Sequence, residues 1–119
     1  MIRSSRLQTL EARLRLLESE FQAELVHALH ACAAGKWGMF AQNERLYAEL
    51  GEQTRTLMSS VEKDLLARAT EIEHLREQLG YADPFPLAQR YREYREMRGP
   101  NVPGEPNMAK LFLQELGLT

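Results

Sequence analysis

The chain has 119 residues, 27% of them charged, with a formal net charge of −2 and one cysteine. This length fits one domain, 1–119, with its own apolar core, and the lone Cys32 excludes an internal disulfide framework. The even charge argues against a basic nucleic-acid surface, and the lack of any run of about 18 apolar residues argues against a membrane span, so we expect a cytoplasmic protein.

The first predicted helix covers about 5–34, a stretch without Pro or Gly. Its apolar residues recur at alternating steps of three and four, which is typical of the seam of an amphipathic, coiled-coil-like helix: Leu7, Leu10, Leu14, Leu17 and Phe21. Beyond Phe21 the apolar stripe widens to Leu25, Ala28, Leu29 and Cys32. Gly35 stands where a left-handed residue would end this helix.

The second predicted helix ends near Leu79, with Gly80 as its stop. Counting backwards from Leu79, the same three-four spacing continues to Trp37. Its apolar members include Leu75, Ile72, Leu65, Val61, Met58, Tyr47, Phe40 and Trp37. Two starts therefore remain open: near residue 37, or after Asn43 as an N-cap, giving a helix of about 37/43–79. Gly51 costs about 1 kcal/mol relative to Ala inside a helix, so a break or bend there is compatible with the pattern.

Two long helices joined by a short link are expected to lie antiparallel, as a helical hairpin. A turn centred near residues 35 and 36 would place Phe21 level with Gly51. The widened stripe on the first helix would remain partly uncovered by one neighbour. We therefore predict a homodimer, most simply a bundle with a four-helix core made of two hairpins.

Two shorter helices are predicted near the C-terminus, about 86–98 and about 107–116. Pro84 and Pro86 mark a turn and a helix start, and the apolar-aromatic face that follows is formed by Leu87, Tyr91, Tyr94 and Met97 or Arg98. The last helix carries Met108, Leu111, Phe112, Leu116 and Leu118. It is too short to be stable alone, so it must fold back on the hairpin or exchange with a second copy. The predicted class is all-α.

The stretch GKWGMF, residues 35–40, places Trp37, Met39 and Phe40 at the predicted turn. These residue types are enriched in the centres of protein interfaces. They either cap the core under the C-terminal helices or form a docking site, with Met39 expected to be exposed. The leading hypothesis is a non-enzymatic interaction or regulatory protein that uses these residues as anchors. No phosphate loop, nucleophile elbow or zinc-ligand spacing occurs, and we expect no cofactor.

A Glu-x-x-His spacing occurs twice, in Glu24 with His27 and in Glu71 with His74. Such pairs place a carboxylate and an imidazole on one helix face, and di-iron bundles use two of them. In a hairpin that turns near residue 36 the two pairs would lie about 25 residues apart, or roughly 35 Å. Only a partner chain could then unite them, so a di-iron-like dimeric bundle is the alternative hypothesis.

Arginines alternate with aromatic residues between residues 90 and 98, which is a pattern that can bind phosphates or bases: Arg90, Arg92, Arg95 and Arg98. Glu93 and Glu96 cancel half of this positive charge. A solvated helix with inward tyrosines is therefore favoured over a nucleic-acid site.

Overall fold

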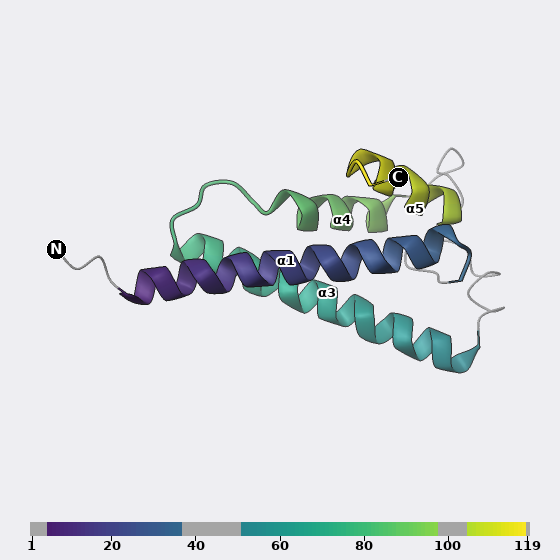
Figure 1. The fold of residues 1–119 in the computed structure, drawn as a ribbon, viewed down its shortest axis with the longest axis horizontal. Helices are drawn as coiled ribbons and strands as arrows, with labels where there is room; N and C mark the ends of the chain where they lie inside the picture. Colours follow the sequence, from purple (N-terminus) through teal and green to yellow (C-terminus); the bar gives the residue numbers. More distant parts are fainter. Residues whose placement is uncertain (1–4, 37–50, 98–104, 119) are drawn as a thin grey trace.

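The computed structural model describes residues 5–36, 51–97 and 105–118. These residues form helices and no strand: α1 (Ser5–Ala33), α3 (Glu52–Gln78), α4 (Pro86–Glu96) and α5 (Glu105–Glu115). Figure 1 shows α1 in the middle, with α3 on one side and α4 and α5 on the other. The predicted all-α class is confirmed for this part of the chain.

The α1 and α3 helices lie side by side and run in opposite directions (Figure 1). Ion pairs link them, since Glu18 accepts a hydrogen bond from Arg76 at 2.9 Å and Glu24 accepts one from Arg68. Increasing residue numbers on α1 thus meet decreasing numbers on α3. The link that would make the two helices a hairpin falls in residues 37–50, outside the described residues, so the hairpin as such stays a prediction.

The register between α1 and α3 differs from the predicted one. A turn at residues 35 and 36 would place Glu24 near residue 48, whereas its ion-pair partner is Arg68. Phe21 is accordingly not level with Gly51, and its ring instead contacts Phe85 and Tyr91. The prediction was wrong because it took the link as a tight turn, whereas 14 further residues, 37–50, separate Lys36 from Gly51.

Both long helices end at a glycine, as predicted. Gly35 has φ 73° and Gly80 has φ 78°, in the left-handed region that residues with a Cβ rarely adopt. At the end of α1, Gly35 N–H donates to the Cys32 carbonyl and Lys36 N–H donates to the Ala31 carbonyl, both at 3.0 Å. These bonds satisfy carbonyls that the helix itself leaves without partners.

The start of α3 is later than predicted. Gly51 is the N-cap residue and is extended, with φ −66° and ψ 157°, so a single helix from residue 37 or 44 to residue 79 does not form. Glycine loses the most conformational freedom in a helix, which favours a break at this position. Glu52 then places a carboxylate in the first turn, where it interacts favourably with the helix dipole.

Buried aromatic rings gather between the second half of α1 and the two C-terminal helices. Phe21 makes edge-to-face contacts with Phe85 and Tyr91, at centroid distances of 5.6 and 6.1 Å. The rings of Tyr94 and Phe112 stack at 4.3 Å. The widened stripe of α1 is completely covered in this region, at Leu25, Ala28, Leu29 and Cys32. The α5 helix thus folds back on α1 of its own chain.

The two short helices differ from prediction in detail. The α4 helix ends at Glu96, because Met97 is already extended with ψ 131°. On α5 the buried residues are Met108, Ala109, Phe112 and Leu113, whereas Leu111 is 40% and Leu118 is 38% exposed. Prediction from apolar residues alone missed Ala109 and Leu113 and placed Leu111 on the wrong face. Since α5 covers the widened stripe, that stripe no longer argues for a homodimer.

Candidate functional site

The predicted anchors of partner binding, Trp37, Met39 and Phe40, lie outside the described residues. The end of α1 and the start of α3, which flank residues 37–50 in the chain, lie towards the same end of the molecule (Figure 1). Leu57, in the second turn of α3, is 59% exposed, whereas its neighbour Met58 is 2% exposed. The sequence pattern did not single out Leu57, because the predicted seam of α3 passes through Met58 and leaves the adjacent leucine off the seam.

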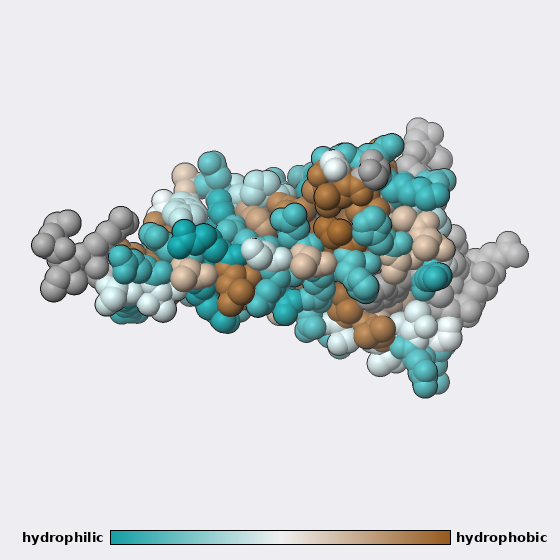
Figure 2. Space-filling view, viewed as in Figure 1, coloured by the Kyte–Doolittle hydropathy of each residue, from teal (hydrophilic) through white to brown (hydrophobic). Residues whose placement is uncertain are grey.

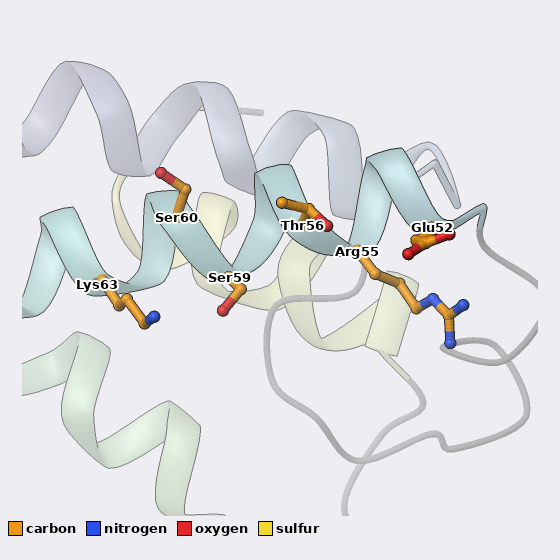
Figure 3. Close-up of a pocket in the computed structure, with 6 residues that line it drawn as sticks. All are labelled: Glu52, Arg55, Thr56, Ser59, Ser60 and Lys63. Atoms are coloured by element: carbon orange, nitrogen blue, oxygen red, sulfur yellow. The ribbon is translucent and has the colours of Figure 1, made fainter.

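A pocket of about 580 Å³ lies along the same part of α3. Its described lining residues are polar and come from one helix: Glu52, Arg55, Thr56, Ser59, Ser60 and Lys63. Figure 3 shows these side chains fanning outwards from α3 instead of converging on one point. Nucleophilic catalysis needs a hydroxyl within hydrogen-bond reach of a base, and the described lining shows no such pair. The pocket thus offers a polar surface beside Leu57.

The Glu-x-x-His pairs are closer than predicted but do not form a metal site in the described residues. Arg13 contacts Glu71 at 2.9 Å, so Glu71 lies near the level of Arg13 on α1, and Arg68 contacts Glu24. Along the axis of α1 the two Glu-x-x-His pairs are therefore at most 11 residues apart, the separation of Arg13 and Glu24, or about 16 Å. The predicted separation of 35 Å was wrong because the register was wrong. Both carboxylates bind arginines.

The two histidines of these pairs, His27 and His74, are exposed. Within residues 5–36, 51–97 and 105–118, no group of three or more His, Cys, Asp or Glu side chains could hold a metal ion.

The arginines of α4 bind carboxylates of neighbouring helices. Arg90 makes two hydrogen bonds to Glu115, at 2.8 and 2.6 Å, Arg92 binds Glu73, and Arg95 lies 3.6 Å from a Glu62 oxygen. Arg98 lies outside the described residues. A carboxylate already occupies the position that a phosphate would take, so these contacts favour a structural role.

The α4–α5 contact combines charge and aromatic packing. The hydrogen bonds from Arg90 lower the pKa of the Glu115 carboxyl, and the carboxylates of Glu115 and Glu93 raise the pKa of Arg90. The Arg90 guanidinium carbon also lies 4.8 Å from the centroid of the Tyr94 ring. Burial raises the pKa of Tyr94 to about 12, and the neighbouring Glu115 charge acts in the same direction. Both partners of the ion pair thus remain charged over a wide pH range.

Cys32 and Tyr91 belong to the same buried core. Both are fully buried, and burial raises the pKa of the Tyr91 hydroxyl to about 12. Among the described residues this hydroxyl has no hydrogen-bond partner, although Arg95 lies 5.6 Å from the ring centroid. The predicted inward position of the tyrosines is confirmed, and Cys32 is a buried small side chain with no open access to a substrate.

A second concave surface lies between α4, α5 and α1. It has a volume of about 440 Å³ and is lined by Gln22, Phe85, Pro86, Leu87, Arg90, Glu115 and Leu116. Arg90 and Glu115 neutralise each other at its polar edge. Figure 2 shows apolar side chains gathered over the α5 region of this face. No sequence signal marked this groove, because its walls come from three helices.

No protein-family model, curated protein or solved structure matches this chain. Of the described helices, none combines the length and the apolar character that crossing a membrane requires.

Proposed function

We propose that the protein is a non-enzymatic interaction or regulatory protein. Its docking surface is an apolar helical surface at the end of the molecule where residues 37–50 connect α1 to α3. The anchors are Trp37, Met39 and Phe40, joined by Leu57 from the start of α3. We further propose that α1 and α3 belong to one helical hairpin and that two copies form a dimeric helical bundle.

The exposure of Leu57 is the observation that carries this proposal. It is the most exposed large apolar side chain among the described residues, and covering a leucine side chain stabilises a complex by about 1.5–3 kcal/mol. The polar pocket beside it, which includes Arg55, Ser59 and Lys63, supplies a rim of hydrogen-bonding groups. An apolar centre with a polar rim is the usual anatomy of a protein interface.

The fluorescence of Trp37, the sole tryptophan, tests the accessibility of this surface. We expect an emission maximum typical of a solvent-exposed indole and efficient quenching by acrylamide. The Trp37→Ala/Phe40→Ala protein should retain its far-UV helical signal and its Tm within a few degrees. A blue-shifted, protected indole, together with a collapse of stability in the variant, would place these rings in the core and contradict the proposal.

Capture from a host extract then tests partner binding. Wild type should retain a protein in stoichiometric amount, and the Trp37→Ala/Phe40→Ala and Leu57→Ser variants should lose it. The matched control is Leu111→Ser, which changes another exposed leucine, 40%, on α5 and should retain the captured protein. Equal capture by all four proteins would contradict a docking surface at this end.

A further inference from the structure

The outer face of α1 is not covered by the described helices except at Val26, which packs against the core. It is formed by residues at alternating steps of four and three: Ser5, Thr9, Ala12, Leu16, Ser19, Ala23, Val26 and His30. All of them are exposed except the half-buried Val26, because α3, α4 and α5 cover the opposite side of the helix. On the face turned to the viewer in Figure 2, pale and brown residues lie along α1 between teal neighbours. We call this set of residues the outer face.

The outer face lacks the charges that a solvated helix surface usually carries. It contains no Asp, Glu, Lys or Arg, although 27% of the whole chain is charged. Leu16 lies near its centre and is 52% exposed. Thr9 further reduces the polarity of the face, because its hydroxyl donates to the Ser5 carbonyl at 2.8 Å. The three-four spacing is the one that allows a second helix to pack along it.

The charges beside the outer face identify the occupant by charge complementarity. The first half of α1, residues 5–16, carries Arg6, Arg13 and Arg15 against Glu11, a formal net charge of +2. The second half, residues 17–33, carries three glutamates and no Lys or Arg. Glu18 and Glu24 pair with Arg76 and Arg68 of α3, whereas Glu20, whose side chain is 43% exposed, follows Ser19 at the edge of the outer face. Two antiparallel copies of α1 would set each positive half against a negative half, whereas parallel copies would set like charges together.

We propose that the outer face of α1 is the interface of a homodimer in which α1 packs antiparallel against α1 of a second copy. This inference rests on the homodimer of the proposed function and names its surface. It differs from a bundle built on the core seams, because α3, α4 and α5 already cover that side of α1. The docking surface near Leu57 stays free, at both ends of the dimer.

In antiparallel packing, the three-four spacing of the outer face favours one register between the two α1 helices. Pairing Leu16 with Ser19 of the second copy also pairs Ala12 with Ala23 and Thr9 with Val26. The same register brings Arg13 near Glu20 of the second copy at two symmetric positions. Arg13 and Glu20 are more than 40% exposed and lie on the edge shared with α3, where their partners are Glu71 and Arg68, so each can contact both helices.

Disulfide cross-linking tests the register. An equimolar mixture of the Ala12→Cys and Ala23→Cys proteins should form a covalent dimer on mild oxidation. Each protein alone should not, because in this register residue 12 lies 11 residues, about 16 Å, from its own copy along the axis. Wild type, whose only cysteine is buried, is the blank. Cross-linking of Ala12→Cys alone would show that residue 12 lies opposite its own copy, as in parallel pairing or in another antiparallel register, and would overturn the proposal.

Sedimentation equilibrium tests the surface. Leu16→Glu would bring two carboxylates within about 5 Å along the axis and should raise the dimer Kd at least tenfold. Leu57→Glu, a matched leucine outside the outer face, should leave the Kd unchanged. Circular dichroism of both variants confirms folding, and the cross-linking result stands if either fails to fold.

The outcomes separate the two proposals. A wild type that stays monomeric at all concentrations overturns both the homodimer and this interface, while docking at Leu57 can still be demonstrated. A dimer that Leu16→Glu leaves intact and that the cysteine mixture does not cross-link overturns this interface alone.

Discussion

The two inner sides of α1 are held by different interactions. Towards α3 the edges of the contact are ion pairs, such as Arg13 with Glu71 and Arg76 with Glu18. Towards α4 the contact includes aromatic rings, in which the buried Phe21 meets the partly buried Phe85 and the buried Tyr91. An ion pair at a surface sets register and direction with little net energy, whereas a buried ring contributes far more to stability. Removing a buried ring on the α4 side should therefore cost more stability than breaking an ion pair on the α3 side.

The largest expected effect is that of Phe21→Ala. It removes a fully buried ring from the junction of α1 and α4 and leaves a cavity, so the free energy of unfolding should fall by about 3–5 kcal/mol. Chemical denaturation followed by circular dichroism measures this loss. The control Leu57→Ala, at a position that is 59% exposed and outside the outer face, should change stability by less than about 0.5 kcal/mol. A loss below 1 kcal/mol for Phe21→Ala would show that the aromatic side does not dominate.

An intermediate effect is expected at alkaline pH. The pKa values of Tyr91 and Tyr94 are raised to about 12 in the folded chain, from an ordinary value of 10, so the unfolded chain loses these protons first. Their contribution to stability is complete below pH 10 and is lost as the pH rises to 12, by roughly 1–3 kcal/mol for each tyrosine. Denaturation curves from pH 8 to 12 measure it.

Tyr91→Phe provides the matched control for this titration. It removes a buried hydroxyl that has no partner among the described residues, so stability at pH 7 should stay equal or rise by about 1 kcal/mol. Its stability should also fall less steeply above pH 10. The same alkaline slope in Tyr91→Phe and wild type would show that Tyr91 is accessible to water.

The smallest effects belong to the α3 side. In double-mutant cycles Arg13 and Glu71, whose side chains are 51% and 45% exposed, should couple by less than about 0.5 kcal/mol. Arg76 and Glu18, at 16% and 23%, should couple by about 1 kcal/mol. Arg76 also donates two hydrogen bonds to the Asp83 carbonyl, so its single variant should cost more than the coupling alone. Equal coupling energies for the two pairs would show that burial does not strengthen the ion pair between Arg76 and Glu18.

The sequence by itself determined the class of structure, the start of α1 and the C-terminal ends of both long helices. Uninterrupted three-four spacing predicts α1 from Ser5 and α3 to Gln78 within a residue or two, because a helix must place its apolar residues on one side. Gly35 and Gly80 end these helices for a local reason, since the left-handed conformation favours glycine. The inward position of Tyr91 and Tyr94 was also readable, because both lie on one face of a short helix.

Only the tertiary structure decided which helices share the apolar surface of α1. Periodicity identifies a buried face but carries no information about the level at which two helices meet. Phe21 therefore contacts α4 instead of facing Gly51, and the glutamates of the two Glu-x-x-His pairs bind arginines. The leucines Leu16 and Leu57 each precede a buried seam residue, Leu17 or Met58, and each is exposed because no described helix covers its side. Long-range packing, which no local pattern encodes, makes that choice.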